Sequence, residues 1–152
     1  YTFFAEVARK EGFEQIAAIF EETAANEKAH AERLLGLLKS IGNTKQNLKT
    51  AIEGEHYEWT QMYPTFEKEA RKEGLTEIAD ALKEIGEVEE QHEKRYTKLL
   101  KNLEEGKVFK KEKVVKWKCR NCGYIHEGKE PPEKCPACGY PRGFYELLCE
   151  NY

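Results

Sequence analysis

An internal repeat constrains this chain more than any other feature of its sequence. The stretch ARKEGFEQIA at Ala8–Ala17 returns as ARKEGLTEIA at Ala70–Ala79, and the similarity extends without a gap over residues 1–40 and 63–102. A repeat of this kind marks one supersecondary unit that occurs twice. Apolar residues at helical spacing and helix-ending glycines predict four helices, near residues 1–10, 13–39, 48–72 and 75–104, with Asn47 as the cap of the third. Each copy of the repeat therefore supplies one helical hairpin, and together the hairpins predict a four-helix bundle.

Both copies carry Glu-x-x-His at matched positions. Glu27 precedes His30 in the first copy, and Glu89 precedes His92 in the second. A spacing of three places both side chains on one face of a helix, and here it is the apolar face that we expect to be buried. Because an unpaired buried carboxylate is costly, two matched occurrences favour a metal site over chance in a charged sequence.

The predicted third helix adds two further carboxylates. In GEHYEWTQMYP, Glu55 and Glu58 stand three residues apart, whereas His56 and Tyr57 are expected to point outward. Bundles that hold two metal ions take a Glu from each of two helices and Glu-x-x-His from each of the other two. Such ligands suit iron or manganese better than a soft metal. A solvated helix face is the alternative for Glu55 and Glu58.

The repeat also points to what the first helix should contain. The positions that match Glu55 and Glu58 fall before Tyr1, so we expect this helix to be truncated at its N-terminus, with its own carboxylate upstream. Tyr1 and Tyr63 occupy matched positions, from which they could hydrogen-bond the metal ligands. Their alternative role is that of aromatic core residues.

The composition changes after Gly106, where two Cys-x-x-Cys pairs follow a basic, β-branched stretch. The pairs are Cys119 with Cys122 and Cys135 with Cys138. Residues 107–152 are too few to bury a secure core, so we expect a metal held by four thiolates. Zinc and iron both accept that geometry. The glycine after each pair favours iron, because it lets backbone N–H groups turn toward the sulfurs. Cys149 is not predicted to be a ligand.

Composition excludes two classes of protein. The sequence is 39% hydrophobic and 35% charged and has no apolar run of membrane-spanning length, which is typical of a soluble protein that does not enter a membrane. Its net charge of −3, with mixed signs, argues against nucleic acid as the main partner. Nothing in the sequence suggests secretion, so a cytoplasmic location is expected.

The combination of two Glu-x-x-His helices, the GEHYE helix, and the CRNCGY and CPACGY pairs resembles the rubrerythrin family over the whole chain. This resemblance implies a mainly α fold. Residues 1–106 would form a ferritin-like bundle with two non-haem irons, and residues 107–152 a rubredoxin-like domain with one iron. By matching motif, the implied ligands of the iron pair are Glu27, Glu55, Glu58, Glu89 and His92. His30 would be an imidazole that can replace a carboxylate on one iron as the redox state changes.

The resemblance also implies an activity. It is the reduction of hydrogen peroxide to water by an NADH-linked peroxidase that protects against oxidative stress. Rubredoxin and an NAD(P)H-dependent reductase would donate the electrons, and the tail iron would relay them; zinc is a possible substitute there. A ferritin-like ferroxidase or iron store would share the bundle but would not need the tail. A zinc-ribbon adaptor would explain the cysteines but not the carboxylates, and a superoxide reductase would need a histidine-rich mononuclear site.

The second connection predicts how chains assemble. In the ferritin-like arrangement the link between the second and third helices runs the length of the bundle. The helix at 13–39 is about 40 Å long, whereas the residues from Ser40 to Asn47 span at most about 28 Å. We therefore favour a domain-swapped homodimer over an up-down-up-down bundle. Each diiron site would combine ligands of both chains. One chain would supply Glu27 and His30, and the other Glu55, Glu58, Glu89 and His92.

Overall fold

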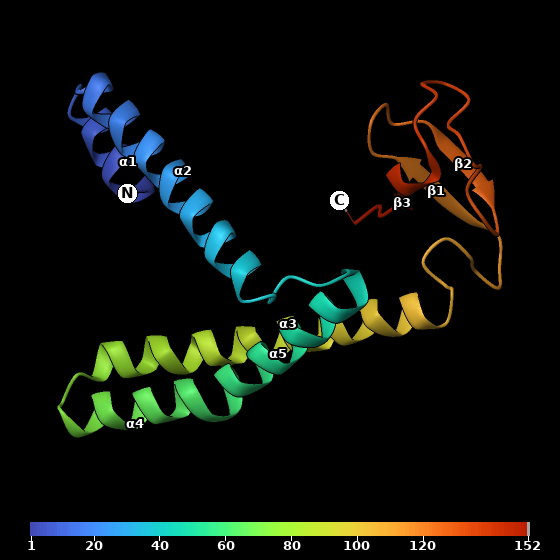
Figure 1. Cartoon of the computed structure of the whole chain (residues 1–152). Helices are drawn as coiled ribbons and strands as arrows, with labels where there is room; N and C mark the ends of the chain where they lie inside the picture. The colour runs from blue at the N-terminus through green and yellow to red at the C-terminus, as the bar shows by residue number, and fades with distance from the viewer. Residues whose placement is uncertain (152) are drawn as a thin grey trace. The chain divides into compact units, whose positions relative to one another are not determined.

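The computed structural model describes residues 1–151, which separate into two compact units at Asn47 and Leu48. The first unit contains α1 (Thr2–Lys10) and α2 (Glu14–Leu37), which lie side by side (Figure 1). The predicted mainly α fold with a small four-cysteine domain at its C-terminal end is confirmed, and that domain forms a small sheet. No helix within residues 1–151 is long and apolar enough to span a membrane.

The repeated ARKEG segment forms the same turn in both copies. At the end of α1, Gly12 has a φ of +86°, and the Phe13 N–H donates to the Ala8 carbonyl over 2.8 Å. A positive φ at the residue after a helix is the usual setting for glycine. The helix that follows packs back through small residues, because Ala8 and Ala17 are both buried.

The second copy closes a hairpin between α4 (Tyr63–Lys72) and α5 (Thr76–Glu104). There Gly74 has a φ of +77°, and the Leu75 N–H donates to the Ala70 carbonyl over 2.9 Å. Ala70 and Ala79, the repeat counterparts of the buried alanines of the first hairpin, are buried as well. The predicted duplication of a helical hairpin is thus confirmed down to its turn and its buried contacts.

The third predicted helix is longer and less regular than the sequence suggests. It begins as α3 (Thr44–Tyr57), passes through a π-helical turn, η1 (Glu58–Met62), and continues as α4. The π-helical turn widens the helix by one residue, and the Tyr63 N–H bonds to the Glu58 carbonyl five residues back. Pro64 follows directly and has no N–H with which to continue a regular ladder.

The predicted cap of that helix is wrong. Asn43, not Asn47, caps it: the Asn43 side chain accepts the Gln46 N–H, and the Gln46 side chain accepts the Asn43 N–H in return. Asn47 lies one turn inside the helix, where its side-chain amide bonds both the N–H and the carbonyl of Gly42. The link from α2 therefore runs only over residues 38–43.

The C-terminal module is a three-stranded antiparallel sheet. Its order is β2 (Ile125–Gly128), β1 (Val115–Cys119) and β3 (Tyr145–Leu147), and the short 3-10 helix η2 (Arg142–Phe144) leads into the last strand. Trp117 fills the core at 1% exposure, and its indole N–H donates to the Gly128 carbonyl over 3.0 Å. A sheet this small has room for little more than one aromatic ring and the cysteines.

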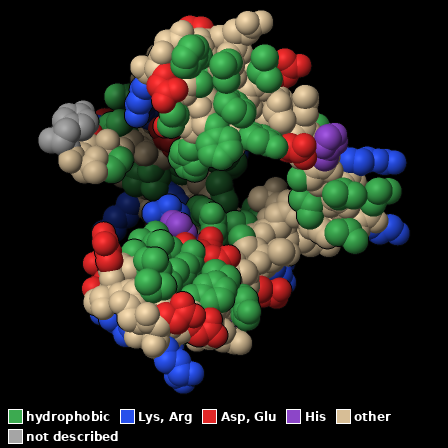
Figure 2. All heavy atoms as spheres, turned by 90° about the vertical axis from the view of Figure 1, so that its left-hand side faces the viewer, with side chains coloured by type: hydrophobic (Ala, Val, Ile, Leu, Met, Phe, Trp, Pro, Cys, Tyr) green, Lys and Arg blue, Asp and Glu red, His purple; other side chains and the backbone are tan. Residues whose placement is uncertain are grey.

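Each helical hairpin, taken by itself, leaves much of its apolar stripe uncovered. Ile16 is 47% exposed and Leu34 60% in the first hairpin, and Ile78 is 52% exposed and Leu99 47% in the second. Figure 2 shows hydrophobic side chains gathered on the face that it presents, next to acidic ones. These stripes were expected to be buried. Two antiparallel helices bury only the seam between them, so each hairpin alone covers its alanines and not its larger residues.

Candidate metal centres

Three of the predicted ligands converge in the second unit. Glu55 comes from α3, and Glu89 and His92 come from successive turns of α5; one ligand atom of each lies within 4.8 Å of the other two. The His92 Nδ1 is 2.6 Å from a Glu89 carboxylate oxygen and 3.5 Å from a Glu55 oxygen. All three side chains are at least half-buried, so they are largely shielded from solvent.

The electrostatics of this group suit a cation. Burial raises the pKa of the Glu55 carboxyl; the His92 charge opposes this shift, and the neighbouring Glu89 carboxylate adds to it. Burial and the neighbouring carboxylate thus make the ionised form of Glu55 costly, and a bound cation would offset that cost by neutralising the charge. Two carboxylates and one imidazole are hard ligands of the kind that iron or manganese accepts.

Glu58 and Tyr63 border this group at opposite ends of the π-helical turn. Glu58 is the first residue of η1 and lies outside the three converging ligands, but its charge contributes to raising the pKa of both Glu55 and Tyr63. Burial, followed by the charges of Glu89, Glu58 and Glu55, raises the pKa of the Tyr63 phenol. Turns of this kind are frequent at functional sites, and the sequence periodicity gave no sign of this one.

Gly86 of α5 makes room for Tyr63. A Cβ at Gly86 would lie 3.2 Å from the Tyr63 Cβ, whereas one at Gly54 of α3 would meet nothing within 4 Å. Replacing a helical Gly by Ala normally adds about 1 kcal/mol of stability. We therefore expect Gly54→Ala to raise the free energy of unfolding of the metal-free protein in urea, and Gly86→Ala to give no gain or a loss of about 1 kcal/mol through overpacking. Equal gains in both variants would contradict this contact.

The other Glu-x-x-His pair lies in the first unit, on α2. The His30 Nδ1 is 3.2 Å from a Glu27 oxygen, which repeats the arrangement of His92 and Glu89. Here both side chains are exposed, at 69% for His30 and 59% for Glu27. Tyr1, the repeat counterpart of Tyr63, stacks on Phe20 with ring centroids 6.2 Å apart and meets Phe4 edge-on. The structure therefore places Tyr1 in an aromatic cluster.

A polar cluster that the sequence did not reveal lies beside the three converging ligands. The Trp59 indole N–H and the His56 ring both bond to one oxygen of Glu93, which tethers α3 and η1 to α5. The Trp59 hydrogen bond is the main cause that lowers the pKa of Glu93. Two features of the sequence could have indicated this cluster. His56 and Trp59 stand three residues apart, and Glu93 directly follows the predicted ligand His92.

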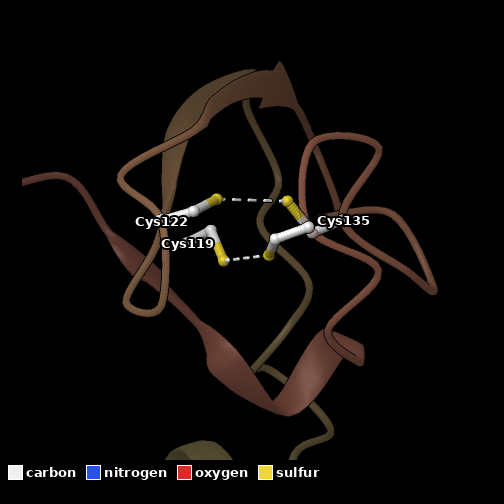
Figure 3. Close-up of side chains that lie close together, drawn as sticks. Cys119, Cys122 and Cys135 are labelled. Carbon is white, nitrogen blue, oxygen red and sulfur yellow. Dashed lines mark hydrogen bonds between the residues drawn. The ribbon is translucent and has the colours of Figure 1, made fainter.

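The second candidate centre is formed by the four predicted cysteines of the C-terminal module. The Sγ atoms of Cys119 and Cys138 are 3.8 Å apart, and those of Cys122 and Cys135 are 3.6 Å apart (Figure 3). These separations are far longer than a disulfide bond, and all four thiols are free. They fit the edges of a tetrahedron around one metal ion. Cys149 is free and exposed and lies outside the group.

Two equivalent loops carry the four cysteines. Gly123, with a φ of +80°, donates its N–H to the Cys119 carbonyl; Gly139, with a φ of +73°, donates to the Cys135 carbonyl. The loop backbone also stabilises the charged form of sulfur, and hydrogen bonding from the Tyr140 backbone is the main cause that lowers the pKa of Cys138. Thiolates of this kind are the form that binds a metal.

Cys135 is a buried cysteine whose surroundings favour the thiolate. Burial opposes its ionisation, but the neighbouring Tyr145 side chain and the backbone N–H groups of Ala137 and Cys138 outweigh burial and lower the pKa of Cys135 to about 6. The thiolate is the form that binds a metal.

Both parts of the chain match known protein families. The family model for rubrerythrin covers residues 1–100, and the model for the rubredoxin-like domain of rubrerythrin covers residues 117–146. A protein of Methanocaldococcus jannaschii is 51% identical over 100% of this chain and 85% of its own length. Rubrerythrin-1 of Clostridium acetobutylicum is 47% identical over 100% of this chain and 87% of its own length. The rubrerythrin of Nitratidesulfovibrio vulgaris is 45% identical over 100% of this chain and 86% of its own length.

Proposed function

Because the chain belongs to the rubrerythrin family, we propose that it reduces hydrogen peroxide to water, with electrons that enter through the four-cysteine module. The observation that carries this proposal is the presence of two unlike donor sets in one chain. Glu55, Glu89 and His92 offer oxygen and nitrogen to a hard metal, whereas four thiolates form a separate, softer site. An enzyme that accepts electrons at one centre and uses them at another needs such a pair of sites.

Both donor sets fit iron. Four converging thiols would hold one iron, and the carboxylate and imidazole groups would hold an iron pair, with Glu58, Glu27 and His30 as further ligands. When bound, the irons supply the two electrons that, with two protons, convert one peroxide into two waters. Zinc also fits four thiolates, but it cannot relay electrons.

The side chains of the chain itself would position peroxide and supply protons. Burial raises the pKa of the Glu55 carboxyl, which lies 3.5 Å from His92, so it takes up a proton more readily than a solvated carboxyl does. The raised pKa of Tyr63 keeps its hydroxyl protonated beside the carboxylates, where it can donate a hydrogen bond to a ligand or to an oxygen of the substrate. Both groups are half-buried, which limits competition from water.

The iron pair requires ligands from two hairpins, and we propose that they come from two chains of a domain-swapped homodimer. The link between α2 and α3 covers residues 38–43 and spans at most about 22 Å, whereas α2 is about 36 Å long. Each hairpin, taken by itself, leaves its apolar stripe exposed, and the hairpins are near-copies of each other. A hairpin of a second copy can therefore cover each apolar stripe with an apolar stripe of its own.

The electron donors follow from the chemistry of the entry site. An iron on four thiolates exchanges one electron at a time, so we propose rubredoxin, reduced by an NAD(P)H-dependent reductase, as the donor to this chain in the cytoplasm. Hydrogen peroxide is the proposed acceptor. The four-cysteine module distinguishes this role from that of a ferroxidase, which would draw its electrons from ferrous iron itself.

Anaerobic titration tests the proposed function. Protein loaded with iron and fully reduced should consume one peroxide for every two electrons that it loses, and the red colour of ferric iron on four thiolates should appear as it is oxidised. Rapid oxidation of added ferrous iron by oxygen, with slow consumption of peroxide, would favour the ferroxidase instead. Zinc in the four-cysteine site of protein made with ample iron would favour the adaptor.

A further inference from the structure

Glu93 of α5 is the common acceptor that joins α3 and η1 to α5. One of its carboxylate oxygens accepts the Trp59 indole N–H, and the same oxygen lies 3.2 Å from the His56 Nδ1. Because a carboxylate accepts hydrogen bonds and does not donate them, both rings are the donors. The two rings also meet edge to face, with centroids 5.6 Å apart. The Glu93 side chain is only 23% exposed, so its hydrogen bonds are stronger than bonds at an open surface would be.

Each member of this cluster directly follows a candidate iron ligand in the chain. His56 follows Glu55, Trp59 follows Glu58, and Glu93 follows His92. Consecutive residues of a helix share one backbone segment, so holding one of them restrains where the side chain of the other can lie. The tether therefore acts on the two segments that bring the ligands together.

The requirements of hairpin packing do not account for the tether. Packing is what the two copies of the repeat share, and the buried alanines recur in both. The residue of the first copy that matches Glu93 is Ala31, whose side chain has no acceptor. In the second copy a π-helical turn, whose hydrogen-bond ladder departs from the regular helical one, carries Glu58. A tether at Trp59 fixes this segment where the backbone ladder is irregular.

We propose that Glu93 is a positioning residue of the metal site: through Trp59 and His56 it fixes the carboxylates of α3 and η1 against His92 before a metal binds. Ligands that are already in place bind more tightly, because less conformational freedom is lost on binding. Partners that orient metal ligands commonly change metal affinity by about 10- to 100-fold. The inference rests on metal binding at this site, as proposed above, and not on the reduction of peroxide.

Two substitutions of Glu93 in the full chain separate the hydrogen bonds from the charge. Glu93→Ala removes both, whereas Glu93→Gln removes the charge but keeps an oxygen that can accept the Trp59 N–H. Each protein is first given iron to fill its four cysteines and is then titrated anaerobically with ferrous iron against a competing chelator. We expect Glu93→Ala to weaken binding at the carboxylate site about 10- to 100-fold, and Glu93→Gln to retain most of the wild-type affinity. Equal losses in both variants would indicate an effect of charge alone and overturn the inference.

Asp80→Ala is the matched control, because it breaks a second tether between the two arms of the same hairpin. Arg71 of α4 donates a hydrogen bond to Asp80 of α5 over 2.9 Å, near the turn that joins these helices. The control variant should bind iron like the wild type. In the metal-free proteins, amide hydrogen exchange across η1 should accelerate in Glu93→Ala but not in Asp80→Ala, because only the first variant releases that segment.

A further variant keeps the inference testable if Glu93→Ala does not fold. Trp59→Phe removes the N–H donor and keeps an aromatic ring, and it should also weaken iron binding and accelerate exchange in η1. Wild-type iron affinity in either variant would overturn the inference. Variants that behave as expected in a protein that does not consume peroxide would refute only the proposed function, whereas a wild-type carboxylate site that takes no metal would refute both.

Discussion

Two inactive variants of this protein should restore each other's activity when they form a heterodimer. One variant carries Glu27→Ala and His30→Ala, and the other carries Glu89→Ala and His92→Ala. In a homodimer of either variant, both iron sites miss two ligands, so each homodimer should be inactive. In a swapped heterodimer one site takes Glu27 and His30 from the second variant and the other ligands from the first, so it is intact. We expect about half of the wild-type peroxide reduction per dimer, because one of two sites is complete.

The matched control places the same four substitutions on one chain instead of two. A chain that carries all four is paired with a wild-type chain, and heterodimers are purified through two different affinity tags. In a swapped dimer both sites then lose ligands, so this pair should be inactive. If each chain instead built its own site, the control pair would keep half of the activity and the first pair would have none, which would refute the swap.

Cys122→Ser should separate electron entry from peroxide chemistry. Loss of a residue that only supports a metal ligand commonly costs about 10- to 100-fold in affinity or activity, so replacing one of four thiolates should cost at least about 100-fold in turnover driven by NADH, reductase and rubredoxin. The carboxylate site does not involve this cysteine and should keep its iron. Chemically reduced variant protein should therefore still consume peroxide in a single turnover.

Cys149→Ser is the control for that experiment, because Cys149 is exposed and lies outside the four-cysteine group. It should turn over at the wild-type rate. If Cys122→Ser also turned over at that rate with the coupled donors, the C-terminal module would not be the route by which electrons enter.

The repeat explains why so much of this structure was predictable. Gly12 and Gly74 recur at matched positions, and each ends a helix with the same turn, so the hairpins could be placed from the sequence alone. The cysteines were predictable for a different reason: two Cys-x-x-Cys pairs in a short segment have few uses besides a shared metal. Local signals of both kinds survive because tertiary packing does not override them.

The features that were missed have no distinct signal in the local sequence pattern. The π-helical turn at Glu58–Met62 was not predicted from the helical spacing of apolar residues, and the tether from Trp59 to Glu93 joins residues on different helices. The cap at Asn43 was missed because Asn47, a residue of the same type, stands one turn later.

The π-helical turn acts as a phase shift between two otherwise continuous helices. One additional residue in a turn delays everything after it by about 100° around the helix axis. Glu55 of α3, before the shift, lies against Glu89 and His92 of α5, and Ala70 of α4, after it, is buried. The residues before the shift carry metal ligands, and those after it pack the hairpin. The inserted residue thus lets the rotation of the ligand-bearing segment differ from that of the packing segment within one stretch of chain.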